Sequence, residues 1–411
     1  MNRVRSDAHA TTHRLRVTAA AALIASVALA GCSQGANSIN ITAHDDVELG
    51  DAVMAAYLSP QTFEWSEFND TGYVVLIDSD GEARSIETSG MDTNQMVWDE
   101  NGLHFSDTEH DYLLDKSGLH ATKSPKTNLQ MSMHTIGTSA VSVYNEGKYA
   151  KDSYRMTVVE HDGKRSSSEP AEGMLTGFAQ CGEAIYATGM ATGPQLKDYR
   201  SSIDRSQGQK VLARLWPGPQ EIIAGADTNP EDFEYFDDAP CVDDTIYYLT
   251  TAQFGKRDAD GVRPTRAVLV KWSVSTGKRT ERILRDTNGD LFPSDKLEFA
   301  SYDARAIRSG AIVWTDGSGK VFETELANGT TRGHSTVANV PDNSDAIYTL
   351  QTESSLYAVE VPYGPQDQII ITRHSLEGGT TEELLRTNDK FTTDTGAVLR
   401  DVALSPALLG Q

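Results

Sequence analysis

Short apolar or alternating runs, separated by turn pairs, make up most of the chain beyond residue 70. Typical turn pairs are Asp80-Gly81, Asp162-Gly163 and Asn328-Gly329. Gly and Asn adopt positive φ at little cost, which favours tight hairpins between neighbouring strands. Helical spacing of apolar residues is scarce outside 45–58, where one short apolar face can form. The pattern predicts an all-β fold preceded by a short helix-like segment.

One apolar strand pattern recurs along the chain. Its copies GLHFSD, AVSVYN, AIYATG, TIYYLT, AIVWTD and SLYAVE start at Gly102, Ala140, Ala184, Thr245, Ala311 and Ser355. The starts are separated by 38, 44, 61, 66 and 44 residues, and most copies are followed by a second strand and a more polar third one. Four short strands in each such interval are typical of a β-propeller blade.

The repeats resemble the blades of WD-repeat and quinoprotein-type propellers, although the regular Gly-His and Trp-Asp pairs of WD repeats are absent. The C-terminal run 398–406 resembles an innermost strand, while the hairpin 73–88 has no inner strand of its own. Pairing the two ends in one composite blade removes open edges and gives seven blades; six or eight also fit. Two β-sandwich domains are the alternative, but no long linker lies between residues 70 and 411.

The first 32 residues follow a different pattern. Arg3, Arg5, Arg14 and Arg16 precede an apolar run at 17–30, which is too short to span roughly 30 Å of hydrocarbon as a helix. The run ends in Leu29-Ala30-Gly31-Cys32, which resembles the lipobox of bacterial lipoproteins. The resemblance implies cleavage between Gly31 and Cys32, lipidation of Cys32 and a place on the extracytoplasmic face of the cell membrane. An ordinary secretory signal with a chance cysteine is the alternative.

These features divide the chain into three parts. We expect a lipoprotein signal peptide at 1–31, a tether with the helix-like segment at 32–60, and the propeller at 61–411. The small, polar residues that follow Cys32 are suited to a flexible tether.

The chain is strongly acidic. It contains 36 Lys and Arg against 59 Asp and Glu, for a net charge of -23, and loss of the signal peptide leaves -26 because four Arg and one Asp go with it. This charge argues against binding of a nucleic-acid backbone and against electrostatic attachment to anionic lipid. We therefore expect no nucleic-acid partner, and membrane contact through the lipid on Cys32.

Two further cysteines directly precede repeat strands, Cys181 before AIYATG and Cys241 before TIYYLT. Equivalent positions in consecutive blades are neighbours near the propeller axis, and exported proteins form disulfides. The sequence predicts a Cys181–Cys241 disulfide, with two buried free thiols as the alternative.

One turn resembles the start of a calcium loop, with oxygen-bearing side chains at Asp286, Asn288 and Asp290. The EF-hand pattern then requires Gly and Glu, where this chain has Leu291 and Leu297. We expect a solvated turn and no bound cofactor, with calcium as the alternative.

His104, His110 and His120 lie among acidic residues, but their spacing matches no standard zinc pattern. We expect them to be exposed histidines on a polar blade edge and predict no metal site there.

Motifs for catalysis are not found in the sequence. There is no Gly-x-Ser-x-Gly elbow or repeated Asp box, and 275–278 lacks the upstream Gly of a phosphate loop. Insertions at 194–209 and 253–265 lengthen two repeats, and we expect them on one rim.

These observations favour a non-enzymatic scaffold that binds a protein, peptide or envelope component, with a basic partner suited to the acidic surface. The alternative is an extracytoplasmic hydrolase, lactonase or quinone-dependent dehydrogenase with its site in the central funnel. Convergent carboxylates in the funnel would favour the enzyme, and an apolar or aromatic patch on the rim would favour the scaffold.

Overall fold

The chain divides into two units, Met1–Ala36 and Asn37–Gln411. The computed structural model describes residues 41–60, 71–150, 153–190, 192, 208–228, 236, 238–255, 263–337, 347–360, 368–387 and 397–410, all in the second unit. The predicted signal peptide, the lipobox-like sequence with Cys32 and residues 33–40 lie outside the described residues.

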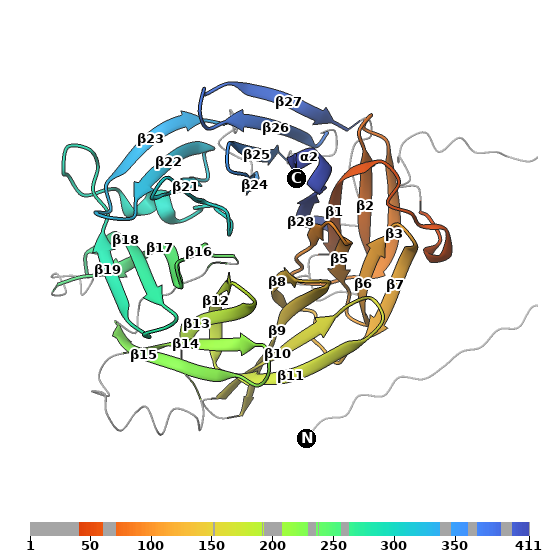
Figure 1. Ribbon diagram of the computed structural model, residues 1–411, viewed down its shortest axis with the longest axis horizontal. Helices are drawn as coiled ribbons and strands as arrows, with labels where there is room; N and C mark the ends of the chain where they lie inside the picture. Colours follow the sequence, from red (N-terminus) through yellow and green to blue (C-terminus); the bar gives the residue numbers. More distant parts are fainter. Residues whose placement is uncertain are drawn as a thin grey trace, which may run out of the picture. The chain divides into compact units, whose positions relative to one another are not determined.

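Seven four-stranded antiparallel sheets form the blades of a ring (Figure 1). Blade 1 combines both ends of the chain, whereas each other blade uses four consecutive strands. From the ring axis outward, blade 1 contains β28 (Ala397–Leu404), β1 (Ala52–Pro60), β2 (Thr71–Asp78) and β3 (Ala83–Ser89). Blade 2 contains β4 (Val97–Asp99), β5 (Gly102–Ser106), β6 (His110–Asp115) and β7 (Gly118–Lys123). Blade 3 contains β8 (Gln130–Ile136), β9 (Ser139–Ala150), β10 (Ser153–His161) and β11 (Ser166–Glu172).

The remaining four blades repeat this arrangement. Blade 4 contains β12 (Met174–Cys181), β13 (Ala184–Met190), β14 (Gly208–Trp216) and β15 (Glu221–Thr228). Blade 5 contains β16 (Cys241–Val242), β17 (Thr245–Gln253), β18 (Thr265–Ser273) and β19 (Arg279–Ile283). Blade 6 contains β20 (Ile307–Arg308), β21 (Ala311–Thr315), β22 (Lys320–Glu325) and β23 (Thr331–Thr336). Blade 7 contains β24 (Ile347–Gln351), β25 (Ser355–Glu360), β26 (Ile370–Ser375) and β27 (Thr381–Arg386).

The predicted all-β propeller with seven blades is confirmed, and the alternative of two β-sandwich domains is wrong. The six repeat strands found in the sequence are the second strands of blades 2 to 7, namely β5, β9, β13, β17, β21 and β25. The predicted composite blade is also present, since β28 pairs with β1 from Met54↔Leu404 to Pro60↔Ala397.

The helix-like interpretation of 45–58 is wrong. A 3₁₀ turn, η1 (His44–Asp46), is followed by strand β1, so blade 1 begins before residue 61. The run from Met54 to Tyr57 is completely buried, because β1 pairs with β28 and β2 along its edges and packs against blades 2 and 7 with its two faces. A continuous apolar run buried on both faces has no strand alternation, and its spacing alone cannot distinguish it from a helix.

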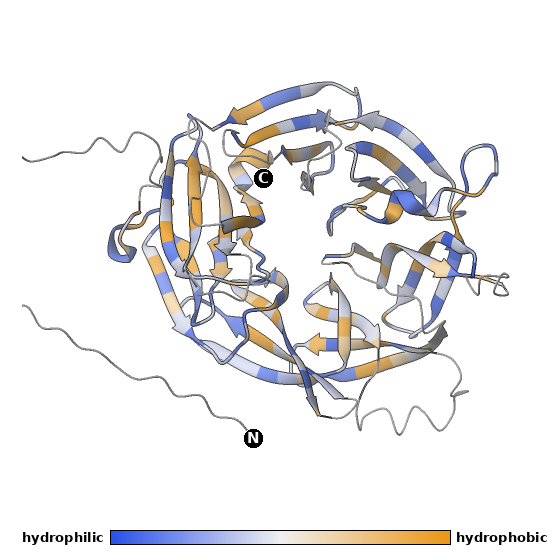
Figure 2. Ribbon diagram, turned by 180° about the vertical axis from the view of Figure 1, so that it is seen from behind, coloured by the Kyte–Doolittle hydropathy of each residue, from blue (hydrophilic) through white to orange (hydrophobic). Residues whose placement is uncertain are grey.

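Hydrophobic clusters join neighbouring blades and so close the ring. Met54 and Val75 of blade 1 share one cluster with Val359 and Ile371 of blade 7. Corresponding clusters link blades 1, 2 and 3, then 3 with 4, 4 with 5, 5 with 6, and 6 with 7. Figure 2 shows hydrophobic and hydrophilic bands alternating along several strands, as expected for sheets packed between neighbours.

The C-terminus is fixed to this core by a short helix, α2 (Pro406–Leu409). The Ser405 hydroxyl accepts the Leu408 N–H as an N-cap, and Leu409 is buried in the cluster between blades 1 and 7.

Candidate functional site

The connections on the two faces of the ring differ in length. Each blade is an antiparallel meander, so first-to-second and third-to-fourth turns lie on one face, which we name the short-turn face. Second-to-third and blade-to-blade connections lie on the opposite, long-connection face. The longest turns on the short-turn face are 274–278, 326–330 and 376–380, whereas the long-connection face carries 191–207, 229–240, 254–264 and 284–306. Long loops are where binding residues concentrate, so the long-connection face is the candidate functional surface.

Two of these connections contain the insertions identified in the sequence, 194–209 and 253–265. Their flanking strands, β13 with β14 and β17 with β18, place both on the long-connection face. Most of their residues lie outside the described part of the chain, so the rim patch expected from them stays a prediction.

The structure describes the whole 284–306 connection, which is anchored to blade 6 by a buried aromatic side chain. Phe292 is only 8% exposed, and its ring meets Trp314 edge-on at 5.9 Å and Phe322 at 5.4 Å between centroids. The short helix η2 (Ser294–Leu297) follows, and the Ser301 N–H then donates to the Thr315 carbonyl at 2.9 Å. The connection is thus a packed surface loop with its own buried side chain.

Two apolar side chains of this connection point outward. Phe299 is 71% exposed, the highest value for a large apolar side chain among the described residues, and Leu291 is 41% exposed. Phe299 lies against Gly317 in the β21–β22 turn, where an added Cβ would come within 2.9 Å of the Phe299 Cβ. Because Gly317 has no side chain, the β21–β22 turn of blade 6 can pack closely against Phe299.

Carboxylates flank these side chains in the sequence. Asp290, Asp295 and Glu298 are exposed. The nearby Lys296 Nζ is bound to Asp316 Oδ2 at 3.1 Å, and Arg285 Nη1 donates to the Gly289 carbonyl at 2.7 Å. Lys296 is thus neutralised by Asp316, whereas Asp290, Asp295 and Glu298 outnumber the remaining cation, Arg285.

The turn that resembles a calcium loop is held by its own hydrogen bonds. Asp286 Oδ1 accepts the backbone N–H groups of Asn288 and Asp290, each at 2.9 Å. The Asn288 side chain donates to the other Asp286 oxygen at 3.4 Å. Within the described residues no group of three or more His, Cys, Asp or Glu side chains is placed to hold a metal ion. The arrangement is that of an Asx turn.

Polar side chains near the ring axis connect successive blades. Each accepts a backbone N–H from the inner segment of the next blade. The pairs are Asp401 Oδ2 with Met96 N at 2.6 Å, Gln95 Oε1 with Met133 N at 2.9 Å, Asp238 Oδ2 with Ala304 N at 3.3 Å, and Asp303 Oδ2 with Gln351 N at 2.8 Å. These acceptors satisfy N–H groups of inner segments that have no further strand beside them.

Asp303 is the carboxyl at the axis with the most altered acidity. Burial raises the pKa of Asp303 to about 6 and Asp238 adds to this effect, while Arg305 and two backbone N–H groups oppose it. His134 Nδ1 lies 3.4 Å from Asp238 Oδ1, which brings an imidazole from blade 3 to the same region. A carboxyl that titrates near neutrality beside a second carboxylate can exchange protons, although both Asp303 oxygens also hold backbone N–H groups.

A buried ion pair joins blades 2 and 3. Lys126 Nζ lies 3.0 Å from Asp111 Oδ1, and both side chains are fully buried. Ser166 of blade 3 donates to Asp111 Oδ2 at 3.2 Å, and Tyr144 of the same blade donates to Asp111 Oδ1 at 3.4 Å. Burial acts to raise the pKa of Asp111, but Lys126 and His161 hold it below its ordinary value. Asp111 thus has five polar partners, of which Lys126 is one. We interpret the ion pair as a structural contact between the two blades.

The three histidines noted in the sequence do not converge. His110 Nδ1 lies 3.7 Å from Asp107, His120 Nε2 lies 3.2 Å from Asp115, and His104 is buried against His161 with ring centroids 5.4 Å apart. The expectation of exposed histidines is wrong for His104, which is fully buried because it lies on the second strand of blade 2 and faces blade 3.

One serine–histidine contact was not foreseen from the sequence. Ser335 Oγ lies 2.7 Å from His374 Nε2, and His374 Nδ1 lies 2.9 Å from Thr381 Oγ1. The contact joins outer strand β23 of blade 6 to β26 of blade 7, away from the axis. The third member is the Thr381 hydroxyl, whereas a catalytic triad has a carboxylate in this place. We therefore interpret these two hydrogen bonds as a structural contact between blades 6 and 7.

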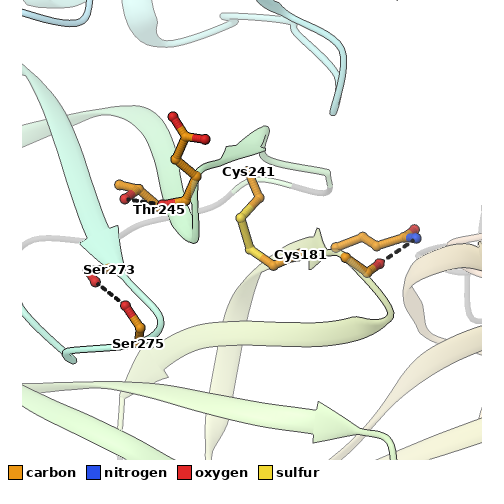
Figure 3. Close-up of a disulfide and its surroundings, with 8 residues drawn as sticks. Cys181, Cys241, Thr245, Ser273 and Ser275 are labelled. Carbon is orange, nitrogen blue, oxygen red and sulfur yellow. Dashed lines mark hydrogen bonds between the residues drawn. A yellow bond between two sulfur atoms is a disulfide. The ribbon is translucent and has the colours of Figure 1, made fainter.

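A disulfide joins Cys181 and Cys241, with a Cα–Cα distance of 5.3 Å. Figure 3 shows it between the ends of β12 and β16, the innermost strands of blades 4 and 5. The sequence predicted this disulfide because the two cysteines occupy equivalent positions in consecutive repeats. In the structure they are neighbours and are bonded.

Sequence reasoning missed Phe299 and the axial acceptors. Phe299 follows Glu298 in a connection without periodicity, and no sequence pattern indicates that its side chain is exposed beside Gly317. The axial residues carried a weak signal, since Asp238 and Asp303 each precede a very short inner strand of their blade.

No helix among the described residues has the length and apolar character needed to cross a bilayer.

The ring of seven four-stranded blades, closed by strands from both chain ends, defines the class of this molecule as a seven-bladed β-propeller. Residues 47–192 match the family model described as "YycP, beta-propeller domain", a range that extends from just before β1 to just after β13. Over these residues, which include β1 and all of blades 2 and 3, the chain is similar to that domain.

Comparison with curated proteins finds no match. Among solved structures, the chain is similar to an apocarotenoid oxygenase from Synechocystis, with 10% identity, a TM-score of 0.47, and coverage of 86% of this chain and 93% of that one. It is also similar to AztD from Citrobacter koseri, with 11% identity, a TM-score of 0.38, and coverage of 85% and 88%. An oligogalacturonate lyase in complex with manganese is 13% identical, with a TM-score of 0.43 and coverage of 83% and 88%.

Proposed function

We propose that this protein is a lipid-anchored, extracytoplasmic scaffold that binds a protein, peptide or envelope component on its long-connection face. The observation that carries the proposal is the outward-facing Phe299 on the packed 284–306 connection. An exposed aromatic side chain on an ordered loop is a feature of recognition surfaces. The lipobox at Cys32 supports the location, and two acyl chains suffice for stable membrane attachment.

Site-specific photocrosslinking in the native envelope tests the binding face. A photoreactive residue at Pro293 or Glu298 samples the long-connection face, and one at Asn101 or Ser275 samples the short-turn face as a matched control. We expect the same discrete crosslinked species from both positions on the long-connection face and none from the controls. Equal crosslinking from both faces, or crosslinking from the short-turn face alone, would contradict the proposal.

The anchor is tested separately. We expect Cys32→Ala to abolish labelling by radioactive palmitate and to release the protein from the membrane fraction. A Cys32→Ala protein that still incorporates palmitate would contradict lipidation at this residue.

A second candidate function is an enzyme with its site at the ring axis. It is favoured by Asp303, whose pKa is raised to about 6, beside Asp238 and within reach of the region occupied by His134. The test is hydrolysis of a panel of lactones and esters across pH 4 to 8. An enzyme of this kind would show a rate inflection near pH 6 that Asp303→Asn removes, whereas no turnover of any panel member would leave this candidate without support.

A further inference from the structure

Phe299 holds an exposed ring on a hydrogen-bonded segment of the 284–306 connection. Its backbone lies between η2 and the Ser301–Thr315 hydrogen bonds, and its Cβ is supported by Gly317. With 71% of the residue exposed, the ring is available to a partner without rearrangement of the loop. A preformed contact of this kind loses little conformational entropy on binding.

Asp295 and Glu298 lie within four residues of Phe299 on the same connection. Asp295 and Glu298 are exposed and have no ion pair within the described part of the chain. The one lysine between them, Lys296, is held by Asp316 at 3.1 Å. Both carboxylates are therefore available to an incoming cation.

We propose that Phe299, Asp295 and Glu298 form a docking site for an arginine side chain of a cationic polypeptide partner. A guanidinium group stacks on an aromatic face and at the same time donates hydrogen bonds to carboxylates, which a simple ammonium does less well. The acidic net charge of -23 draws such a partner toward the surface. The inference rests on the proposed scaffold function and names the chemistry of its partner.

The direct test is peptide binding to the full chain in neutral detergent, followed by calorimetry. The probe is a ten-residue peptide of Arg alternating with Gly and Ser, compared with peptides in which Lys or the uncharged citrulline replaces Arg. We expect the affinity to fall from Arg to Lys, with no measurable binding of the citrulline peptide. Equal binding of the Arg and Lys peptides would overturn the role of the aromatic ring.

Variants at the site separate the aromatic contribution from the charge. Phe299→Leu keeps an apolar side chain but removes the π face, and we expect it to weaken the Arg peptide about two- to fivefold. Asp295→Asn and Glu298→Gln should each weaken binding by a similar factor and reduce its dependence on salt. These residues are exposed, so unchanged thermal unfolding can serve as the check that each variant folds.

Matched controls sit on another blade. Glu169→Gln removes an exposed carboxylate from β11, and Tyr149→Leu removes a half-exposed aromatic ring from β9. We expect neither to change binding of the Arg peptide. If Glu169→Gln weakens binding as much as Glu298→Gln, the peptide is responding to overall acidity and the inference fails.

Two outcomes distinguish this inference from the proposed function. If crosslinking from the long-connection face persists while the Phe299, Asp295 and Glu298 variants bind the peptide normally, the scaffold function stands and the arginine site is wrong. If a full-length Cys32→Ala protein binds phosphatidylcholine vesicles and Phe299→Leu abolishes that binding, the ring enters a bilayer and the arginine site is likewise overturned.

Discussion

At the scale of single residues, His161 links pH to the contact between blades 2 and 3. Burial lowers the pKa of His161 to about 4, with His104 and Lys126 acting in the same direction and Asp111 and Asp162 against it. Between pH 6.5 and 4 the unfolded chain binds a proton that the folded chain excludes, so stability falls as the pH falls through this range. This imidazole contributes a loss on the order of 3 kcal/mol.

The first prediction is that His161→Gln reduces this acid sensitivity. Urea unfolding at pH 6.5 and at pH 4.5 should give a smaller difference in unfolding free energy for the variant than for the wild type. His334→Gln, which changes an exposed histidine, should leave the difference unaltered. An unchanged pH dependence in His161→Gln would show that another group governs the acid response.

Asp303 has the opposite effect on stability in an overlapping range of pH. Because its pKa is raised to about 6, the folded chain binds a proton that the unfolded chain has lost between about pH 4 and 6. Its contribution to stability is therefore complete below pH 4 and is lost as the pH rises through 6.

The second prediction is that Asp303→Asn makes stability rise more steeply with pH between 4 and 6, since the opposing titration is removed. Unfolding by urea at closely spaced pH values measures the slope, and His161→Gln should change that slope in the opposite direction. A variant whose slope equals that of the wild type would contradict the raised pKa of Asp303.

At the scale of elements, a strand could be predicted from the sequence wherever its own residues form an apolar run bounded by turn residues. The second strands of blades 2 to 7 are apolar runs next to tight turns, such as β21 after Gly310, which has a φ of 79°. Strand β1 could not be recognised because its two faces are buried by blades 2 and 7, and blade 7 lies near the far end of the chain.

The residues of the candidate site were harder to predict than the strands, because their contacts depend on tertiary structure. Asp401 accepts the Met96 N–H across 305 positions of sequence, and no local pattern encodes such a contact. Phe299 is exposed although it contacts Gly317, and the same residue buried against another blade would look no different in the sequence. Cys181 and Cys241 were the exception, because equivalent places in consecutive repeats predict neighbours.

The third prediction concerns the disulfide between β12 and β16. It links cysteines 60 positions apart, so replacing both with Ala should lower the unfolding free energy by about 2–4 kcal/mol through greater freedom of the unfolded chain. Mass spectrometry after alkylation should show no modified thiol at these positions until the protein is reduced. Alkylation of both cysteines without a reductant would contradict the bond, and Ser275→Ala in the same region provides a control for the unfolding measurement.

At the scale of the whole molecule, closure depends on one strand from the C-terminal end. Strand β28 supplies the inner edge of blade 1, and Val402, Leu404 and Leu409 enter the cluster shared with blade 7. Without them the β1 edge and part of this cluster would face water, and an open strand edge favours association between molecules. Closure is therefore a cooperative property of the ring and not of any one blade.

The fourth prediction follows from this closure. Deletion of residues 397–411 should abolish cooperative thermal unfolding and cause aggregation, because it removes a complete paired strand as well as its apolar side chains. Deletion of 406–411 alone removes α2 and buried Leu409 but keeps β28, and should lower stability by only about 1.5–3 kcal/mol. A synthetic peptide of residues 396–411, added to the longer deletion during refolding, should restore a sharp transition by pairing with β1. If the longer deletion unfolds as cooperatively as the shorter one, blade 1 is stable without its C-terminal strand and the ring does not depend on this closure.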